Sequence, residues 1–324
     1  MRVLVVGGAG YIGAHMSKML AEAGHEVVVL DNLSTGHRQA VRWGVFEEAA
    51  LADRDRLAAI FDKHRFDAVM HFAAASIVAE SVRDPLKYYR NNVADVISLL
   101  DAMQRHEVRR FIFSSTAAVF GEPQQHTIDE QHPLQPINPY GASKLAVERM
   151  LLDCANAYGF GAIALRYFNA AGADSSGLIG ESHQPETHLI PRLLRAAQGE
   201  DIDVKIYGSD YPTGDGTCIR DYIHVTDLCA AHLAALNHLQ SAPGFHAYNL
   251  GNGRGYSVRE VVAAVERVVG RSLGVEVAAR RPGDSARLVA SSDKARSELQ
   301  WQPCMPELER IVESAWRWHR EPAY

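Results

Sequence analysis

Short apolar runs alternate with longer amphipathic stretches over the first 170 residues of the chain. The apolar runs predict strands at 2–6, 26–30, 67–71, 110–114 and 162–167. The stretches between them repeat their apolar positions with helical spacing and predict helices at 11–23, 54–64, 86–106 and 139–158. Strands that alternate with helices form a parallel sheet covered on both faces, so the pattern predicts an α/β protein with a doubly wound parallel sheet.

The pattern changes after Asn169. Gly, Ser, Pro, Asp and Thr dominate residues 170–188 and 207–217, which predicts loops. The remaining segments predict helices at 189–199, 226–239, 257–268 and 306–319, and strands at 246–250 and 273–279. Because we expect the chain to return to the first domain at 246–268, we predict two domains. The first comprises residues 1–168 with about 216–268, and the second is a smaller, discontinuous α/β lobe of residues 169–215 with 269–324.

A glycine-rich turn follows the first apolar run and leads directly into a predicted helix, as Gly7-Gly-Ala-Gly-Tyr-Ile-Gly13. Glycines permit positive φ and let the backbone approach a pyrophosphate, which then rests on the positive end of the helix. Asp31 ends the second run, about 20 residues further on, where a carboxylate can bind ribose hydroxyls and would repel a 2′-phosphate. A glycine turn alone is often only a tight connection, but with Asp31 it predicts a Rossmann-type domain that binds NAD rather than NADP.

A second candidate site is the pair Tyr140 and Lys144, which would share one face of a helix. A nearby cation favours the phenolate and lowers the pKa of a tyrosine from about 10. Thr116, which ends the run Ser114-Ser-Thr116 after an apolar strand, could bridge Tyr140 to a substrate hydroxyl. The same Tyr-x-x-x-Lys spacing occurs by chance in many helices, so it indicates a catalytic pair only in combination with the glycine turn near the start of the chain.

The composition of the chain excludes several classes of protein. The chain has 324 residues, of which 47% are hydrophobic and 22% charged, with a net charge of −6. No Lys/Arg run exceeds a pair and no apolar run reaches the roughly 18 residues of a membrane span, so neither nucleic acid nor a membrane is an expected partner. The four cysteines are scattered, so we expect free thiols and no metal site. Without a visible signal peptide, these features predict a cytoplasmic protein.

The motifs follow one another in the order found in UDP-glucose 4-epimerases, a family of extended short-chain dehydrogenase/reductases. They are Gly7 to Gly13, Asp31-Asn-Leu-Ser-Thr-Gly36, His71-Phe-Ala-Ala74, Ser114-Ser-Thr116, Tyr140-x-x-x-Lys144, Leu165-Arg-Tyr-Phe-Asn169, Gly216-Thr-Cys-Ile-Arg-Asp-Tyr-Ile-His224 and Arg280-Arg-Pro-Gly-Asp284. The resemblance runs from the first residue to about residue 301. It implies bound NAD, a UDP-sugar substrate, interconversion of UDP-galactose and UDP-glucose, and a homodimer.

The resemblance also assigns roles to individual residues. Tyr140 would take the proton from the sugar C4 hydroxyl as hydride leaves C4, Thr116 would hold that hydroxyl, and Lys144 would bind the nicotinamide ribose and keep Tyr140 acidic. The implied cofactor-binding residues are Gly7, Gly10, Tyr11, Ile12, Gly13, Asp31, Asn32, Leu51, Phe72, Ala73, Ala74, Asn91, Ser114, Tyr140, Lys144, Tyr167 and Phe168. The implied substrate-binding residues are Val78, Thr116, Tyr140, Asn169, His188, Leu189, Lys205, Tyr207, Arg220, Arg281, Asp284 and Leu288.

Some positions depart from the family pattern. Ala49-Ala50-Leu51 replaces the usual Gly-Asp that holds the adenine amino group, which puts cofactor affinity in question. Ser76 and His188 stand where some members have lysine and asparagine, and Leu288 where some have tyrosine. The smaller leucine predicts room for an N-acetyl group on the sugar. A related NAD-dependent epimerase, acting on UDP-N-acetylglucosamine or on a UDP-pentose, therefore remains an alternative. A dehydratase, a decarboxylase and a non-catalytic NAD-sensing protein are more distant alternatives.

Overall fold

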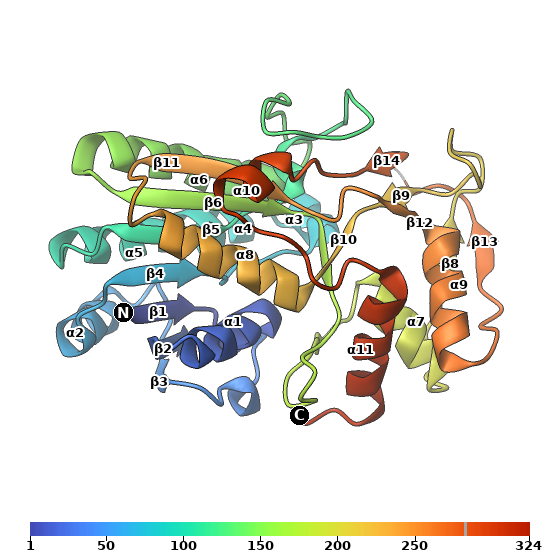
Figure 1. Cartoon of the computed structure of the whole chain (residues 1–324), viewed down its shortest axis with the longest axis horizontal. Helices are drawn as coiled ribbons and strands as arrows, with labels where there is room; N and C mark the ends of the chain where they lie inside the picture. The colour runs from blue at the N-terminus through green and yellow to red at the C-terminus, as the bar shows by residue number, and fades with distance from the viewer. Residues whose placement is uncertain (282–283) are drawn as a thin grey trace.

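The computed structural model describes residues 1–281 and 284–324, and its largest feature is a seven-stranded parallel sheet. The strand order is β11-β6-β5-β4-β1-β2-β3, so β1 lies inside the sheet and the chain winds outward from it in both directions (Figure 1). The strands are β1 (Arg2–Val6), β2 (Glu26–Asp31), β3 (Val45–Glu48), β4 (Ala68–His71), β5 (Arg110–Ser114), β6 (Gly161–Tyr167) and β11 (Phe245–Leu250). This arrangement confirms the predicted doubly wound α/β sheet.

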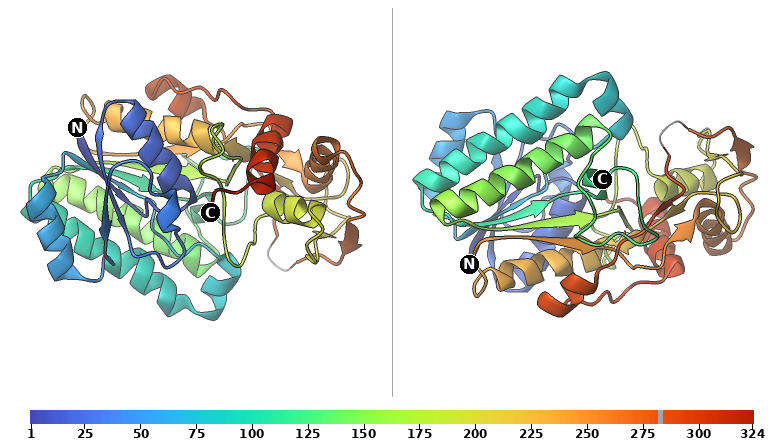
Figure 2. Two further views of the ribbon diagram at one scale, coloured as in Figure 1. Left: turned by 90° about the horizontal axis from the view of Figure 1, so that it is seen from below. Right: turned by 90° about the horizontal axis from the view of Figure 1, so that it is seen from above.

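Helices cover both faces of the sheet, as Figure 2 shows from two sides. One face is covered by α1 (Tyr11–Glu22) and α8 (Val225–His238), and the other by α2 (Arg54–His64), α5 (Asp95–Arg105) and α6 (Pro139–Tyr158). Side chains alternate between the faces, as strand geometry requires: Val3 and Val5 pack toward α1 and α8, whereas Leu4 and Val6 pack toward α2 and α5. Strands buried on both faces explain the continuous apolar runs of the sequence.

A smaller lobe follows the sheet domain, at the right of Figure 1. Its three helices, α7 (Leu189–Ala197), α9 (Val258–Val269) and α11 (Leu308–Arg320), share one apolar core. Its short strands pair as β8 (Lys205–Tyr207) with β13 (Glu276–Ala278), and as β9 (Ile219–Arg220) with β12 (Tyr256–Ser257) and β14 (Arg287–Leu288). A further pair, β7 (Asn169–Ala171) with β10 (Tyr222–His224), lies where the chain passes between the domain and the lobe.

The predicted domain division needs one correction, at helix α9. The sequence placed residues 216–268 in the first domain, and within that segment β11 does join the large sheet and α8 does cover it. By contrast, α9 buries Val261 and Val265 against α7 and α11. Its apolar stripe fits a three-helix core as well as a sheet face, so its periodicity could not reveal which of the two it covers.

Other elements differ in length from their predictions. The predicted helix 86–106 consists of α4 (Pro85–Tyr89), a π-helical turn (Arg90–Ala94) and α5, and it is preceded by α3 (Val78–Arg83). Short 3₁₀ turns occupy Arg38–Ala40 and Ala117–Val119, and α10 (Asp293–Glu298) packs beside β11. The sequence missed β3 because Val45 is exposed and two acidic residues end the strand. In the described part of the chain, no helix combines the length and apolarity needed to cross a membrane.

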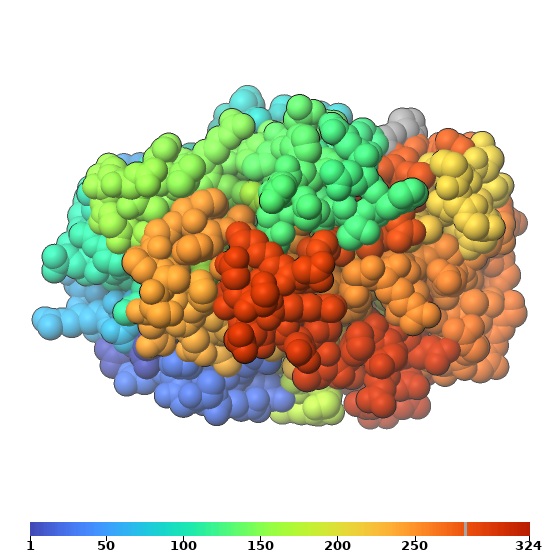
Figure 3. Space-filling view, turned by 45° about the horizontal axis from the view of Figure 1, so that its top comes forward, coloured from blue at the N-terminus to red at the C-terminus, as the bar shows by residue number. Residues whose placement is uncertain are grey.

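One loop joins the sheet domain to the lobe. The segment between the 3₁₀ turn at Ala117–Val119 and α6 meets residues near β14, with Ile128 donating its backbone N–H to Val289 (2.9 Å) and accepting from Ser291 (2.8 Å). Figure 3 shows this green loop lying against the red-orange segment of the lobe. The loop follows the 3₁₀ turn that Thr116 caps, so the edge of the sheet and the lobe are held in a fixed relation at that point.

Candidate functional site

The glycine turn after β1 is packed against the carboxyl end of β4. Gly7 has a φ of +78°, and a Cβ there would lie 2.6 Å from the backbone nitrogen of Ala73. A Cβ on Gly13 would lie 2.1 Å from the carbonyl oxygen of Gly7. Only glycine fits these two positions, because a side chain at either would push the turn away from β4 or from α1. The structure thus brings the predicted residues Gly7, Gly13, Ala73 and Ala74 to one edge of the sheet.

The first turn of α1 is suited to an anion. Gly10 caps the helix without a side-chain hydrogen bond, and the turn contains no acidic residue. A Cβ on Gly10 would meet only the carbonyl oxygen of Gly7, at 3.3 Å, so the backbone there is open to a ligand. Helix N-terminal N–H groups that no side chain caps bind phosphate well. These features fit the pyrophosphate of NAD against Gly10, Tyr11, Ile12 and Gly13, as the sequence predicted.

Asp31 lies at the carboxyl end of β2 beside this turn. Its carboxylate accepts hydrogen bonds from the backbone N–H groups of Ala9 (2.9 Å) and Leu33 (2.8 Å). Burial raises the pKa of Asp31, and these backbone donors oppose the rise. The side chain is thereby fixed in orientation, and each oxygen retains a lone pair for a ribose hydroxyl. Leu51, the other predicted adenosine contact, is buried, whereas Asn32 is exposed.

The predicted catalytic residues meet at the carboxyl end of β5. Lys144 is 3% exposed and donates from Nζ to the carbonyl oxygen of Ser114 (2.8 Å). The Ser114 hydroxyl in turn lies 2.6 Å from the hydroxyl of Tyr167 at the end of β6. Burial lowers the pKa of Lys144 to about 7, although the charge of Glu148 opposes that shift. Lys144 is therefore held by the strand end rather than by an acidic partner in direct contact.

Tyr140 lies in the first turn of α6 because of three neighbouring residues. Asn138 caps the helix by accepting from the backbone N–H of Gly141 (2.9 Å), and Pro139 takes the first helical position. A Cβ on Gly141 would lie 2.4 Å from the carbonyl oxygen of Ala118, so only glycine lets α6 start this close to the loop after β5. This packing places Tyr140 beside Thr116.

The pKa of Tyr140 differs from its prediction. Burial raises this pKa, and a hydrogen bond with the Thr116 hydroxyl opposes the rise. The expected lowering by Lys144 is not found in the protein alone, where burial has the largest effect on this pKa. The Thr116 hydroxyl also accepts from the backbone N–H of Ala118 (3.1 Å), which fixes its position. Tyr140 and Thr116 therefore lie close together, but the pKa of Tyr140 is raised rather than lowered.

A buried ion pair that the sequence did not reveal supports these residues. Glu148, one turn after Lys144 on α6, binds Arg166 of β6 through contacts of 2.6 to 3.2 Å, and both side chains are under 5% exposed. The Ser115 hydroxyl donates to the same carboxylate (2.5 Å). Glu148 therefore joins α6 to the ends of β5 and β6, directly beneath Tyr140 and Lys144.

Several predicted substrate residues meet in the lobe. Arg220 donates to the carbonyl oxygen of Ser285 (2.7 Å) and lies 3.5 Å from the carboxylate of Asp284. Arg281 contacts the other oxygen of Asp284 (3.1 Å), and its guanidinium lies 4.6 Å from the ring centroid of Tyr207. Pro282 and Gly283, the centre of this motif, lie outside the described residues. Two arginines and an aromatic ring grouped in this way suit a nucleoside diphosphate.

Leu288 and Asn169 connect the lobe to the catalytic edge. Leu288 packs against an apolar cluster that contains Ala117, Leu145 and Phe168. Asn169 donates its side-chain N–H to the carbonyl oxygen of Asp221 (2.8 Å). No role was predicted for Asp221, which is fully buried and accepts three backbone N–H groups, from Asn252, Gly253 and Ala290.

Four predicted binding residues do not join the glycine turn, the catalytic residues or the arginines of the lobe, or they contact other side chains. Asn91 donates to the side chain of Asn92 (2.8 Å), and it is Asn92 that is buried and holds the backbone of Ala75. Val78 is 44% exposed at the start of α3. Lys205 pairs with Asp203 (2.9 Å). Phe72 packs on the buried ring of His232, with 4.9 Å between the ring centroids. Their predicted contacts with ligands stay predictions.

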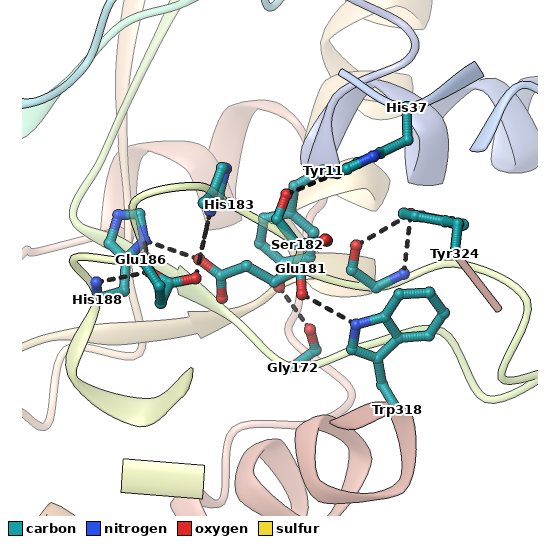
Figure 4. A network of polar contacts seen from close by, with 11 residues as sticks. Tyr11, His37, Gly172, Glu181, Ser182, His183, Glu186, His188, Trp318 and Tyr324 are labelled. Atoms are coloured by element: carbon teal, nitrogen blue, oxygen red, sulfur yellow. Dashed lines mark hydrogen bonds and ion pairs between the residues drawn. The ribbon is translucent and has the colours of Figure 1, made fainter. Parts of the chain in front are cut away.

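The remaining predicted substrate residues, His188 and Leu189, start α7 after a loop rich in acidic and histidine side chains. Nδ1 of His188 lies 2.8 Å from Glu181 and 3.2 Å from Glu186, and Nδ1 of His183 lies 3.3 Å and 3.6 Å from the same two carboxylates (Figure 4). Burial lowers the pKa of each histidine, but Glu181 and Glu186 outweigh it, giving values of about 9 for His183 and about 10 for His188. This group, the Glu181–His188 cluster, was not predicted because its members lie in a loop without periodicity.

Comparison with known proteins identifies the family. Residues 3–251 match the model of the NAD dependent epimerase/dehydratase family. The chain belongs to this family. It is 51% identical over 321 residues to a UDP-glucose 4-epimerase of Halalkalibacterium halodurans, covering 99% of this chain and 96% of that protein. It is 50% identical over 317 residues to a UDP-glucose 4-epimerase of Rhizobium leguminosarum bv. trifolii, covering 98% of this chain and 97% of that protein.

Solved structures of epimerases superpose over nearly the whole chain. A UDP-glucose 4-epimerase from Brucella ovis in complex with NAD is 52% identical, with a TM-score of 0.93 and 97% of each chain covered. An epimerase from Stenotrophomonas maltophila with bound NAD and formylated UDP-arabinopyranose is 39% identical, with a TM-score of 0.95, and covers 99% of this chain and 98% of that chain. These relatives therefore share the overall fold of this chain.

Proposed function

We propose that the protein is a UDP-glucose 4-epimerase, which interconverts UDP-galactose and UDP-glucose through a 4-keto intermediate while NAD stays bound. The observation that carries this proposal is the meeting of Thr116, Tyr140 and Lys144 at one edge of the sheet, beside a glycine turn built for a pyrophosphate. The full-length similarity to UDP-glucose 4-epimerases supports it. The sheet domain would hold NAD, and the lobe would hold the UDP-sugar.

The chain's own residues account for the proton transfers. Thr116 would hold the C4 hydroxyl of the sugar against Tyr140, which accepts its proton. Bound NAD supplies a reversible acceptor for the C4 hydride, and its positive charge opposes the effect of burial on the pKa of Tyr140. Lys144 would leave the Ser114 carbonyl oxygen for the nicotinamide ribose. After the keto sugar turns over, Tyr140 returns the proton as hydride re-enters the opposite face of C4, so the configuration inverts without net oxidation.

The site disfavours related reactions of the family. Dehydration and decarboxylation need additional acid or base groups beside the Ser/Thr run, and here Ala117 and Ala118 follow Thr116. A non-catalytic NAD-binding protein is disfavoured because Tyr140 and Lys144 are both present and held by specific hydrogen bonds. A coupled assay with UDP-galactose, UDP-N-acetylgalactosamine and UDP-arabinose tests the proposal. Activity on none of these sugars would refute it.

We expect the cofactor to be NAD rather than NADP, because the fixed carboxylate of Asp31 would repel a 2′-phosphate. At a separation of a few ångströms, that repulsion should make NADP bind at least about tenfold more weakly. The protein should release nicotinamide dinucleotide on denaturation, and it should lose it more readily than relatives that keep an aspartate at the position of Ala50. Reconstitution of stripped enzyme with each dinucleotide measures the preference, and better recovery with NADP would contradict it.

We expect Leu288 to leave room for an N-acetyl group at C2 of the sugar. Leu288 packs against the apolar cluster that contains Ala117, the residue after Thr116. Activity on UDP-N-acetylgalactosamine should therefore accompany activity on UDP-galactose. Leu288→Tyr should lower kcat/KM for the acetylated sugar by roughly tenfold more than for UDP-galactose, as expected when one group is sterically excluded. Equal losses on both sugars would show that Leu288 does not line the C2 side.

We also propose a homodimer, formed through the face on which α5 and α6 lie side by side (Figure 2). Among the apolar residues of this region, Val96, Leu100, Leu145 and Leu151 are buried in the protomer, and Val93 is partly buried. Tyr89 and Leu152 remain 41% and 44% exposed, and Ile97 of α5 is 41% exposed. Light scattering should give twice the chain mass, and Ile97→Glu with Leu152→Glu should shift it toward the monomer. A monomeric parent protein would contradict the proposal.

We also propose that the protein is cytoplasmic. Its four cysteines are free thiols, and cysteines are kept reduced in the cytoplasm.

A further inference from the structure

The Glu181–His188 cluster has an unusual composition for a buried group. The side chains of Glu181 and Glu186 are 4% and 3% exposed, and the only ion-pair partners they have among the described residues are His183 and His188. Buried carboxylates are costly unless they are paired with charge or coordinate a metal. Two imidazoles can supply that charge only by holding two protons, whereas one divalent cation would neutralise both carboxylates at once.

The geometry of the four groups is that of a chelate. One ligand atom from each residue can be chosen so that all four lie within 4.8 Å of one another. The histidine nitrogens lie 2.8 and 3.3 Å from Oε1 of Glu181, and 3.2 and 3.6 Å from the two different oxygens of Glu186. Ligand atoms around a tetrahedral zinc ion, each about 2.0 to 2.2 Å from the metal, lie roughly 3.4 Å apart. The observed separations bracket that value.

The orientation of the polar atoms supports the same interpretation. Both histidines direct Nδ1 at the same oxygen, Oε1 of Glu181. Despite these short separations, neither Oε1 of Glu181 nor Nδ1 of His183 forms a hydrogen bond of acceptable geometry with any group in the described part of the chain. Nδ1 of His188 does hydrogen-bond Oε1 of Glu186 (3.2 Å), but Oε1 of Glu181 and Nδ1 of His183 approach closely without aligning, as ligands around a common centre would (Figure 4).

We propose that the Glu181–His188 cluster binds one Zn²⁺ ion through Nδ1 of His183 and His188 and one carboxylate oxygen each of Glu181 and Glu186. Two imidazoles and two carboxylates are a ligand set that zinc accepts, and four protein ligands close a structural site. His188 is half exposed and gives the ion a route from solvent. Binding would release the protons that the histidines carry in the metal-free protein. His188, which was predicted to bind substrate, would then be a zinc ligand, and the ion would take no part in the proposed proton transfers.

The ion would fix a loop that several parts of the protein meet. The carbonyl oxygen of Glu181 accepts from the indole of Trp318 (2.9 Å), and that of Ser182 accepts from His37 (3.1 Å). His183 packs edge-on against Tyr11, with 6.3 Å between the ring centroids, and Tyr11 begins α1 beside the glycine turn. Zinc would therefore stabilise the connection between the lobe and the start of α1, which is a structural rather than a catalytic role.

The test uses untagged protein with its cofactor bound, stripped of metal by a chelator and then dialysed. Isothermal titration with Zn²⁺ should give one ion per chain, and Co²⁺ should produce the intense visible bands of tetrahedral coordination. Zn²⁺ at 100 times its dissociation constant should raise Tm by about 4 °C. His183→Asn and Glu186→Gln should each weaken binding by more than the roughly 10- to 100-fold seen when an outer-sphere partner is lost.

Matched controls separate this site from adventitious binding. His126→Asn and Glu307→Gln remove an exposed histidine and an exposed carboxylate elsewhere and should bind Zn²⁺ like the parent. Circular dichroism verifies that each variant is folded, and the Co²⁺ spectrum of the parent decides the question even if a variant is not. Absence of stoichiometric Zn²⁺ binding, or equal binding by the His183→Asn and His126→Asn variants, would refute the proposal. The cluster would then be two histidinium–glutamate pairs.

Discussion

Tyr140→Phe should lower kcat for UDP-galactose by roughly 10²- to 10⁴-fold, the range typical of a lost general base. The phenyl ring retains the packing of the tyrosine, including its edge-on contact with Tyr88, so only the hydroxyl that meets Thr116 is lost. KM should change little, because the arginines and Tyr207 of the lobe would still hold the nucleotide. Steady-state kinetics with the coupled assay measures both constants.

Tyr158→Phe is the matched control for that variant. Tyr158 ends the same helix, is 47% exposed and lies far along α6 from the first turn. Removal of the Tyr158 hydroxyl should leave kcat within about twofold of the parent, because this exposed hydroxyl lies away from the proposed reacting groups. If Tyr140→Phe is folded and turns over like Tyr158→Phe, Tyr140 is not the base.

Glu148→Ala should lower the free energy of unfolding by roughly 3 to 5 kcal/mol, because it leaves the buried guanidinium of Arg166 without its partner. It should also lower kcat, since Ser115 loses its acceptor next to Thr116 and the end of β5 is no longer tied to α6. Urea denaturation measures the first effect, and kinetics at a temperature where the variant is folded measures the second.

An exposed ion pair provides the comparison for Glu148. Glu309 pairs with Arg267 at 2.7 Å, and both side chains are more than half exposed. Glu309→Ala should therefore cost no more than about 1 kcal/mol, because solvent screens such pairs. Equal losses of stability in Glu148→Ala and Glu309→Ala would show that burial does not set the strength of the first pair.

The sequence predicted best those features whose parts are adjacent in the chain. The glycine turn lies between its strand and its helix, and Tyr140 and Lys144 share one helix, so the two spacings together were informative. Glu148 has the same four-residue spacing from Lys144, yet its role depends on Arg166, which lies within an apolar strand and gives no periodic signal. Nothing in the sequence showed that these two charges would be buried together.

Other differences between the predictions and the structure also arise from contacts that the sequence does not reveal. Helix α9 has an apolar stripe that the sheet or the lobe could have buried, and only the fold determines which of them does. The Glu181–His188 cluster depends on the path of a loop, and loops have no period from which side-chain directions can be inferred. The pKa of Tyr140 was likewise predicted from the nearest charge in the sequence, whereas burial is the larger effect in the structure.

The order in which helices cover the sheet affects how the chain folds while it is being synthesised. The face buried by α1 and α8 includes residues of β1 and β6, but α8 starts at Val225, nearly 60 residues after β6 ends at Tyr167. While the ribosome makes the intervening segment, Ile163 and Leu165 of β6 are on a face that has not yet received its second helix. Exposed apolar strands of this kind are prone to aggregate. The growing chain should therefore need a chaperone most over the interval between β6 and α8.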